Sequence, residues 1–376
     1  MAIKPKKVAR RGIGSVPTNA SADDLVKSFT SKYGNQSISV GRSLQQPERI
    51  PLSVFMMDFH LLGGLPVNRT SMVLGERSAG KTMIACKAIA GAQSLYDDKI
   101  PALVDVEGTF DSTWAEALGV DTSKLIVASP SSGEEAVDMS VELLRLNHVS
   151  LVVVDSVAAL VPIKEIESDA EDSLVGAQAR MTSSMVRKTT QAMIDMRKNG
   201  LYNTLLFVNQ YRAKIGGFAG YGEPKSVPGG RALEYSTSVQ LVIKNKETVR
   251  ANAIGIDSVA ENEHAYSITK NKMNGGGRTG EFRVCRIPNE ELGLGVGDVH
   301  DADTMLAYAK KFGIYTGGGS SWELALPSGT YKCRGSTDAM QRLYGERSLY
   351  WELRNYLIAL NARELGMDED FVSRYL

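Results

Sequence analysis

The sequence predicts an α/β fold: a mostly parallel central sheet, preceded by an N-terminal helical arm and followed by a small C-terminal α+β domain. Between about residues 69 and 287, short apolar runs such as "SLVVVD" and "NTLLFVNQ" alternate with helical stretches such as "GEEAVDMSVELLRLN". Nearly continuous apolar runs are typical of parallel strands covered on both faces. The last runs, "SVQLVIKN", "YSITKNK" and "EFRVCRI", follow one another without helices. They indicate an antiparallel extension at one edge.

The N-terminal arm, residues 1–45, contains one helical pattern, "SADDLVKSFTSKYG". Ser21 is its expected N-cap, because a hydroxyl can accept a hydrogen bond from the first free backbone amides. Four apolar residues follow at helical spacing: Ala22, Leu25, Val26 and Phe29. This apolar face must pack either on the chain's own domain or on a neighbouring subunit, and the sequence does not choose between them.

Composition favours a cytoplasmic protein. Lys and Arg total 43 and so do Asp and Glu, so any nucleic-acid binding must depend on local basic patches. No apolar stretch of about 18 residues is present, and the basic N-terminus has no apolar segment behind it, so neither a membrane span nor a secretory signal is expected. The three cysteines and four histidines show no disulfide or metal-site spacing.

A phosphate-binding loop is predicted at "GERSAGKT", which fits G-x-x-x-x-G-K-[ST] between a strand and a helix. Its residues are Gly75, Glu76, Arg77, Ser78, Ala79, Gly80, Lys81 and Thr82. Glycines let the backbone approach the phosphates, and the helix N-terminus supplies N–H donors. Lys81 is expected to contact the β- and γ-phosphates, and the Thr82 hydroxyl to ligate Mg²⁺.

Polar residues close three neighbouring strands. Asp155 ends "SLVVVD" and is a candidate for holding Mg²⁺, usually through water. Glu107, after "PALVDV", could polarise the water that attacks the γ-phosphate. Asp105 competes for that role, and strand parity does not separate the two because they share a face. Gln210 ends "LLFVNQ", where its amide could contact the γ-phosphate.

A glycine-rich segment follows Gln210. Residues 213–235 hold six glycines, and a loop longer than about 12–15 residues is usually functional or disordered. It is therefore either a binding element or a surface excursion.

The predicted core spans residues 46–289, and residues 290–376 form the small α+β domain. This domain has helical stretches around "DADTMLAYAKKFG" and "SLYWELRNYLIALNARELG", with a hairpin between them.

Taken in order, these motifs resemble the RecA family of homologous-recombination ATPases. "GERSAGKT" stands at the family's Walker A loop, "VDVEGTFDSTWAEALGVD" at its catalytic-glutamate segment, and "VVVDSVAALVPIKEIE" at its Walker B strand and first DNA-binding loop. "GAQARMTSSMVRK" is similar to the helix after that loop, "FVNQYRAKIG" and "PGGRALEY" to the two ends of the second loop, and "TKNK" to a lysine pair that reaches a neighbouring subunit's nucleotide. The likeness covers about residues 60–290.

The resemblance implies roles for individual residues. It favours Glu107 over Asp105 for water activation and places Asp155 at the Walker B position. Asp111 and Trp114 fall where the family holds adenine. Gln210 becomes the sensor between γ-phosphate and the second loop, and Lys270 and Lys272 act in trans, which requires a filament.

For DNA, the resemblance implies two loops, at about 162–178 and 213–231. The implied DNA-binding residues are Val175, Arg180, Ser183, Arg187, Gly229, Gly230 and Arg231. Arg180 and Arg187 are seven residues apart and share one helix face. No base-reading helix is evident, so we expect sequence-independent, salt-dependent binding.

The implied function is that of an ATP-dependent recombinase that forms filaments on single-stranded DNA, pairs it with homologous duplex and exchanges strands. Two alternatives share the fold: a filament protein or assembly regulator without strand exchange, and a helicase-type motor, which the lysine pair disfavours. The loop has Glu76, Arg77 and Ala79 where bacterial members usually have Pro, Glu and Ser, and the long acidic tail is lacking. We therefore interpret the chain as a divergent member, with phage origin as a hypothesis.

Overall fold

The computed structural model describes residues 19–33, 46–167, 176–213, 225–226, 230–253 and 256–376. A central sheet dominates it, with the strand order β13-β12-β11-β10-β3-β7-β6-β4-β5. Its parallel strands are β3 (Thr70–Gly75), β4 (Ile100–Asp105), β5 (Ile126–Ala128), β6 (Val149–Asp155) and β7 (Thr204–Gln210). The antiparallel extension comprises β10 (Val239–Ala253), β11 (Ile256–Asn271), β12 (Arg278–Cys285) and β13 (Val299–His300). The predicted α/β fold with a mostly parallel sheet is confirmed.

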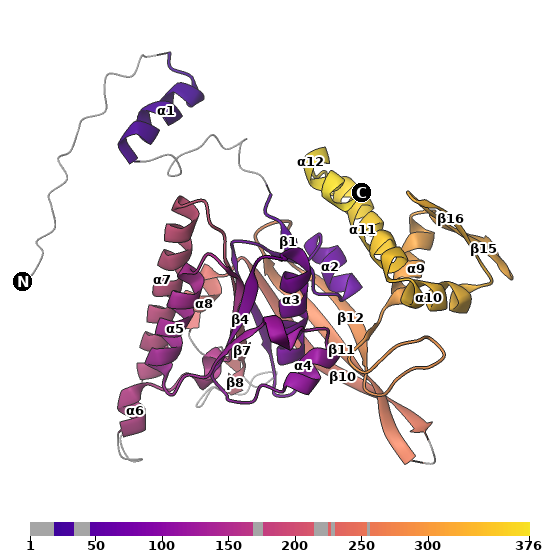
Figure 1. The fold of residues 1–376 in the computed structure, drawn as a ribbon, viewed down its shortest axis with the longest axis horizontal. Coiled ribbons are helices and arrows are strands. Elements are labelled where there is room, and N and C mark those ends of the chain that lie inside the picture. Colours follow the sequence, from indigo (N-terminus) through magenta and orange to yellow (C-terminus); the bar gives the residue numbers. More distant parts are fainter. Residues whose placement is uncertain (1–18, 34–45, 168–175, 214–224, 227–229, 254–255) are drawn as a thin grey trace, which may run out of the picture.

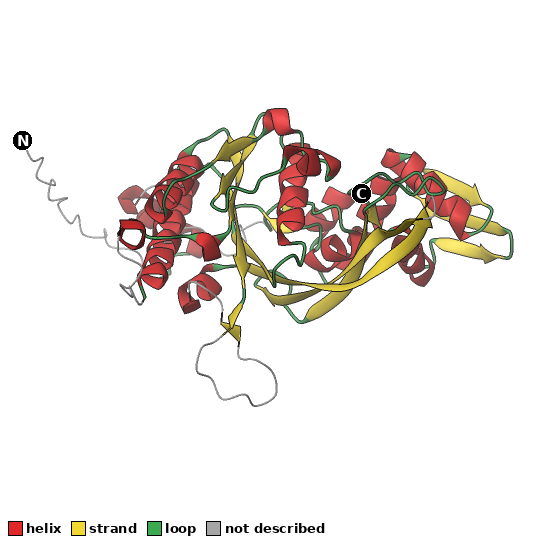
Figure 2. Ribbon diagram, turned by 90° about the horizontal axis from the view of Figure 1, so that it is seen from below, coloured by secondary structure: helices red, strands yellow, loops and turns green. Residues whose placement is uncertain are grey.

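Helices cover both faces of this sheet, as Figure 2 shows. Helix α3 (Lys81–Leu95) packs on one face, and α5 (Gly133–Arg145) and α7 (Ala177–Lys198) pack on the other. Successive residues of β6 alternate between the two layers: Leu151 and Val153 join the α3 side, whereas Val152 and Val154 join the α5 and α7 side. A strand buried on both faces needs apolar residues at every position, which explains the continuous run in the sequence.

The antiparallel hairpin is much longer than its apolar runs indicate. Strands β10 and β11 contain 15 and 16 residues and continue through the polar segments "KETVRANA" and "IDSVAENE". Three register shifts interrupt their pairing. In Figure 1 this hairpin projects from the lower edge of the body. Sequence reading missed the extension because backbone hydrogen bonds, and not burial of apolar side chains, hold a projecting hairpin together.

Helix α1 (Ala22–Tyr33) begins as predicted. The Ser21 Oγ accepts a hydrogen bond from the Asp24 backbone N at 3.2 Å, and the Asp24 carboxylate accepts one from the Ser21 N at 3.1 Å. This reciprocal pair is a capping arrangement. Figure 1 shows α1 standing apart from the rest of the described chain, and the Leu25 side chain is 39% exposed. Where the apolar face packs stays open.

The C-terminal region contains helices around a small sheet. Strands β14 (Tyr315–Gly318), β15 (Ser321–Leu326) and β16 (Gly329–Cys333) form a three-stranded antiparallel sheet, one strand more than the expected hairpin. The helices here are α9 (Ala302–Lys311), α10 (Ser336–Gly345), α11 (Arg347–Glu364), α12 (Glu369–Val372) and the 3₁₀ turn η4 (Ser373–Tyr375). The boundary at residue 290 stays a prediction.

The remaining short elements lie between these. They are β1 (Arg49–Ile50), α2 (Phe55–Leu61), β2 (Leu65–Pro66), α4 (Ser112–Ala117), η2 (Thr122–Lys124), η3 (Val157–Ala159), α6 (Ile163–Glu167), β8 (Arg212–Ala213), β9 (Lys225–Ser226) and α8 (Gly230–Ser236). Within the part of the chain that the structure describes, no helix has the length and apolar character needed to cross a membrane.

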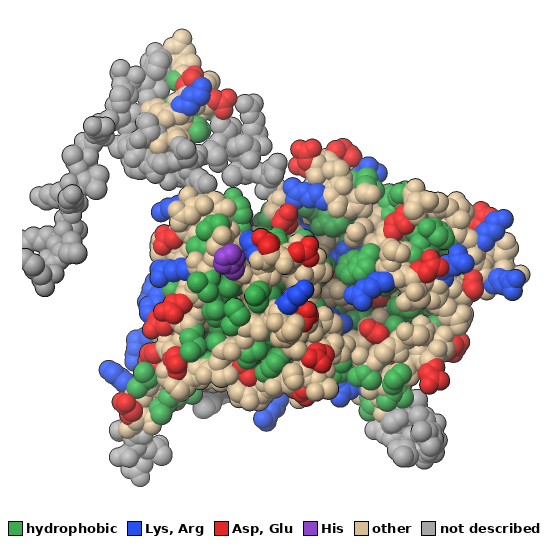
Figure 3. Space-filling model, viewed as in Figure 1, with side chains coloured by type: hydrophobic (Ala, Val, Ile, Leu, Met, Phe, Trp, Pro, Cys, Tyr) green, Lys and Arg blue, Asp and Glu red, His purple; other side chains and the backbone are tan. Residues whose placement is uncertain are grey.

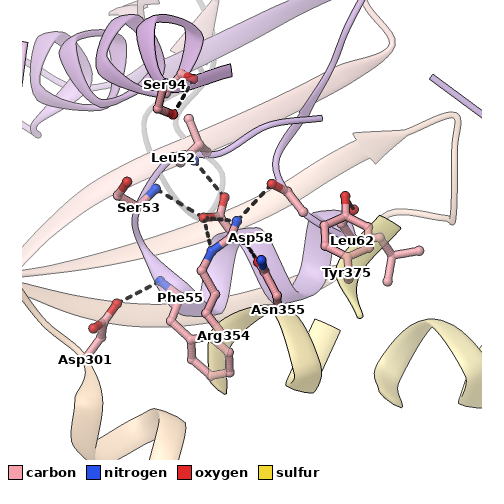
Figure 4. A network of polar contacts seen from close by, with 12 residues as sticks. Leu52, Ser53, Phe55, Asp58, Leu62, Ser94, Asp301, Arg354, Asn355 and Tyr375 are labelled. Carbon is pink, nitrogen blue, oxygen red and sulfur yellow. Dashed lines mark hydrogen bonds and ion pairs between the residues drawn. The ribbon is translucent and has the colours of Figure 1, made fainter. Parts of the chain in front are cut away.

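A buried polar network joins the start of the core to the C-terminal helices (Figure 4). The Asp58 carboxylate on α2 accepts hydrogen bonds from the Leu52 N at 2.8 Å and from the Arg354 Nη2 on α11 at 2.7 Å. The side chains of Arg354 and Asp58 are 3% and 0% exposed. Nearby, Asp301 accepts from the Phe55 N at 2.8 Å and from the Tyr350 hydroxyl. The start of the core is thus held directly to the C-terminal helices.

Candidate active site

The predicted phosphate loop connects β3 to α3. Gly80 is the N-cap of α3 and has φ of 94°, a conformation that favours glycine. A Cβ added to Gly75 would lie 2.6 Å from the Ile243 carbonyl oxygen, so glycine is required there as well. Both positions follow from the close backbone approaches that a phosphate cradle needs.

Lys81 opens α3 and folds back over the loop. Its side chain is 7% exposed, and its Nζ donates a hydrogen bond to the Glu76 carbonyl oxygen at 2.6 Å. Burial lowers its pKa, while the negative charges of Asp155 and Glu107 act in the opposite direction. The ammonium group is therefore held inside the loop, beside two carboxylates.

Thr82 and Asp155 meet at the ends of α3 and β6. The Thr82 Oγ1 donates to the Asp155 Oδ2 at 2.7 Å. Burial, together with the neighbouring Glu107 charge, raises the pKa of Asp155 to about 6, although the hydrogen bond from Thr82 acts in the opposite direction. A hydroxyl and a carboxylate at this distance are hard oxygen donors of the kind that bind Mg²⁺ together with phosphate oxygens, so the donor set fits that ion.

The geometry separates Glu107 from Asp105. The buried Asp105 carboxylate accepts hydrogen bonds from the Gly108 N at 3.0 Å and the Phe110 N at 2.9 Å, so it closes its own turn. Glu107 is exposed and instead accepts from the Ser156 Oγ at 2.5 Å and the Gln210 Nε2 at 3.0 Å. Only Glu107 is directed toward the ends of neighbouring strands.

Asp111 and Trp114 stand together at the start of α4. The Asp111 Oδ1 accepts a hydrogen bond from the Trp114 N at 3.1 Å and so caps this helix. The Arg286 guanidinium carbon lies 4.8 Å from the centre of a Trp114 ring. Sequence reasoning missed Arg286. It lies 172 positions after Trp114, and no local sequence pattern indicates a contact between them.

The antiparallel strands support the phosphate loop from one side. The Asn245 Nδ2 on β10 donates to the Ser78 carbonyl oxygen at 2.8 Å. The His264 ring on β11 is 3% exposed and lies where a Cβ on Gly80 would meet it at 3.0 Å. Burial lowers the pKa of His264. Neither residue was among the predicted site residues, because neither belongs to a recognisable sequence motif.

Lys270 and Lys272 lie at the other end of the sheet from the phosphate loop. Lys270 pairs with Gln240, which in turn pairs with Met72, whereas Gly75 at the loop pairs with Ile243. Both lysines donate to the Tyr235 carbonyl oxygen at 3.3 Å. Within one chain, the structure does not bring them to Lys81.

The predicted DNA-binding residues divide between described and undescribed positions. Arg180 and Arg187 on α7 are exposed, and the Ser183 hydroxyl donates to the Ala179 carbonyl oxygen at 2.8 Å. Figure 3 shows Lys and Arg side chains along the edge of the molecule where α7 lies. Gly230 and Arg231 open α8. Val175 and Gly229 lie outside the described residues, as do residues 168–175 of the first predicted loop and most of the second.

The root of the second loop is described. Strand β7 ends at Gln210, whose amide contacts Glu107, and β8 then pairs with β9 through Arg212 and Ser226. One residue thus separates the strand that carries Gln210 from the strand pair at the root of the loop. This fold, with its glycine-lined loop, paired Thr82 and Asp155, and Glu107 beyond the strand ends, defines the class of P-loop ATPases.

Comparisons with known proteins specify the family. The model of the RecA N-terminal domain matches residues 21–286. The chain is 36% identical over 276 residues to Protein RecA of Saccharopolyspora erythraea, covering 72% of this chain and 76% of that protein. It is 38% identical over 255 residues to Protein RecA of Mycobacteroides abscessus, covering 67% and 70%. The chain belongs to the RecA family of ATP-dependent recombinases, which act in DNA recombination and repair, so the resemblance drawn from its motifs is confirmed.

Proposed function

We propose that this chain assembles into helical filaments on single-stranded DNA, pairs that strand with homologous duplex DNA and exchanges strands. The observation that carries the proposal is the hydrogen bond of 3.0 Å between the Gln210 Nε2 and the Glu107 Oε1. It connects the carboxylate beside the phosphate loop to the last residue of β7, directly before the segment 213–231. A change at the γ-phosphate would therefore reach that segment through one side chain.

ATP and Mg²⁺ are the proposed cofactors. Mg²⁺ would neutralise phosphate charge during phosphoryl transfer, and Thr82 and Asp155 would hold it. Lys81, already inside the loop, would contact the β- and γ-phosphates. Glu107 would orient and polarise the attacking water, with Ser156 and Gln210 fixing its carboxylate. Asp111 and Trp114 would hold adenine, and the remaining loop residues would line the phosphates.

The neighbouring copy would complete this site. Lys270 and Lys272 lie at the sheet end opposite their own phosphate loop. The Lys270 Nζ donates to the Glu234 carbonyl oxygen at 2.5 Å, and both ammonium groups donate to the Tyr235 carbonyl oxygen at 3.3 Å. In a filament they would supply positive charge to the next subunit's phosphates, as an arginine finger does. ATP would then lie at every subunit interface.

DNA would bind along α7 and the two loops. Arg180 and Arg187 present exposed guanidinium groups on one face of α7, and Ser183 lies between them in sequence. We include Val175, Gly229, Gly230 and Arg231 in the proposed contact set on the family resemblance alone. Because phosphate contacts dominate such an interface, binding would be sequence-independent and weakened by salt.

The decisive experiment measures ATP hydrolysis with and without single-stranded DNA and then D-loop formation with a homologous duplex. We expect DNA to stimulate hydrolysis and D-loops to form. Stimulated hydrolysis without D-loops would contradict strand exchange and leave a filament protein or assembly regulator. The helicase-type alternative predicts ATP-driven unwinding of a forked duplex, and the family assignment does not favour it.

A further inference from the structure

Four arginines lie near the end of the central sheet where β3 begins, opposite the phosphate loop. Arg49 begins β1, Arg69 directly precedes β3, Arg197 lies in the last turn of α7, and Arg374 lies in η4. The charges of Arg374 and Arg69 both act on Arg49, and that of Arg197 acts on Arg69. Elements from both ends of the described chain therefore bring like charges together at one place.

Arg49 is the unusual member of this arginine cluster. Its side chain is 5% exposed, and its Nε, Nη1 and Nη2 atoms have no hydrogen-bond partner among the residues that the structure describes. The guanidinium carbon lies 5.7 Å from the centre of the Phe371 ring, and that of Arg374 lies 5.6 Å from the same ring. Burial lowers the pKa of Arg49 to about 10, so it is still charged at neutral pH. A buried charged donor without partners is strongly unfavourable.

The described part of the fold supplies no acidic partner for this cluster. Among the described residues, none of the four arginines forms an ion pair; Arg69 and Arg197 donate to the Asn68 carbonyl oxygen, and Arg374 donates to that of Gln46. The buried Arg354 on α11 is the contrast, because it pairs with the Asp58 carboxylate at 2.7 Å. The same protein thus neutralises one buried guanidinium and leaves another without an acid.

We infer that the arginine cluster is a binding site for a phosphate-class oxyanion, with Arg49 as its principal donor. The planar guanidinium fork matches two phosphate oxygens, and the desolvated position strengthens the attraction. Arg69 and Arg374 supply the additional positive charge. Because the Arg49 nitrogens are enclosed, neighbouring side chains have to move for the anion to enter. The anion is either free phosphate or a phosphodiester of a nucleic-acid backbone.

The first test compares thermal unfolding in phosphate and in chloride at equal ionic strength and pH. In chloride, Arg49→Met should be at least as stable as the natural chain, because the substitution removes an unpartnered buried charge. Phosphate should stabilise the natural chain more than Arg49→Met, because both proteins keep the phosphate loop and only the natural chain keeps Arg49. Arg145→Met, an exposed arginine on α5, is the matched control and should respond to phosphate as the natural chain does. Calorimetric titration with inorganic phosphate should show at least about tenfold weaker binding to Arg49→Met.

A second measurement distinguishes the source of the phosphate. If the anion belongs to a nucleic-acid backbone, free phosphate has little effect, and Arg374→Gln lowers the salt slope of oligonucleotide binding by about one unit relative to Arg145→Gln. Arg374 is exposed, so this variant also serves if Arg49→Met fails to fold. The inference is overturned if Arg49→Met loses stability equally in both buffers and Arg374→Gln matches its control in both assays.

Discussion

At the scale of single residues, the two acidic candidates after β4 show how local hydrogen bonding assigns roles. Asp105 ends β4 and Glu107 follows two residues later. The Gly108 and Phe110 backbone amides donate to Asp105, whereas the Ser156 and Gln210 side chains donate to Glu107. A carboxylate that accepts hydrogen bonds from two backbone amides stabilises a turn. One that is held by neighbouring side chains is available to a ligand.

This difference gives opposite expectations for two conservative substitutions. Glu107→Gln should lower the rate of ATP hydrolysis by about a hundredfold or more, because it removes the proposed base, while nucleotide binding is retained. Single-turnover hydrolysis and fluorescent-nucleotide binding measure the two quantities. Asp105→Asn should instead lower stability, because two backbone amides lose a charged acceptor. Equal effects of both substitutions on hydrolysis, without loss of stability, would contradict this division.

His60 makes the stability of the fold depend on pH. It lies at the end of α2, where its Nδ1 is 2.9 Å from the Tyr266 hydroxyl and its carbonyl accepts from Arg278. Burial, with the Arg278 charge, lowers its pKa to about 4. Because this value lies below that of the unfolded chain, its contribution to stability is fully present above about pH 6.5 and is lost as pH falls toward 4.

We therefore expect His60→Gln to reduce the pH dependence of the free energy of unfolding. Between about pH 7 and pH 5, the natural chain should lose about 1–2 kcal/mol more than the variant, after discounting for partial exposure. Denaturant unfolding at both pH values measures this difference. An equal loss in both proteins would show that another group titrates.

At the scale of elements, the long β10–β11 hairpin does more than extend the sheet. Its Asn245 donates to the Ser78 carbonyl, and its His264 packs beneath Gly80, so the hairpin supports the phosphate loop from outside the P-loop motif. The same hairpin carries Lys270 at its other end. One element thus connects the loop of its own subunit to the surface proposed to face the next.

Removing the hydrogen bond to Ser78 should weaken nucleotide binding without abolishing it. Asn245→Ala loses one exposed hydrogen bond, worth about 1 kcal/mol, and should reduce ATP affinity up to about fivefold. Equilibrium binding of a fluorescent ATP analogue measures the change. Asn252→Ala, on the same strand but paired with Asp257 far from the loop, is the control and should leave the affinity unaltered.

Complementation tests whether the lysine pair acts on a neighbour. Lys81→Ala and Lys270→Ala chains should each be inactive as homogeneous preparations, because each lacks one half of every site. Mixed on single-stranded DNA, they should recover hydrolysis at interfaces where a natural phosphate loop meets a natural lysine pair. Activity of Lys270→Ala alone would refute the proposed role in trans.

At the scale of the whole molecule, the C-terminal helices are held to the core by a charged network and not by apolar packing alone. Arg354 on α11 reaches both Asp58 and the Gly63 carbonyl, and Asp301 caps the start of α2 by accepting from Phe55. Burial raises the pKa of Asp301 to about 7. Near neutral pH this carboxyl is therefore only partly ionised and contributes less negative charge. The Asp58–Arg354 pair is therefore the principal electrostatic connection.

Breaking this pair from one side should be severe. Arg354→Met leaves the fully buried Asp58 uncompensated and should cost about 3–5 kcal/mol of unfolding free energy. Combining it with Asp58→Asn should recover part of the loss, because the unpaired charge is then removed. Denaturant unfolding of the two single variants and the double variant measures the coupling, and strictly additive losses would contradict it.

Much of the fold and part of the site could be predicted from sequence because the signals are local. The run Leu151–Val154 predicts a doubly covered strand, "GERSAGKT" predicts a phosphate loop, and Ser21 predicts a helix start. Each depends on residues within one turn or strand, where side-chain chemistry acts on the adjacent backbone. The contacts of Arg286 with Trp114 and of Asn245 with Ser78 could not be predicted, because they join residues about 170 positions apart.

The sequence by itself therefore determined the alternating layers, the phosphate loop, the acidic strand ends and membership of the RecA family. Only the tertiary structure decided that Asp105 closes a turn while Glu107 contacts Gln210, and that Lys270 lies at the sheet end away from its own phosphate loop. It also decided that Arg354 has an acid partner, whereas Arg49 has none among the described residues. The physical reason is that charge and hydrogen-bond partners are set by distance in space, whereas periodicity and motif are set by distance along the chain.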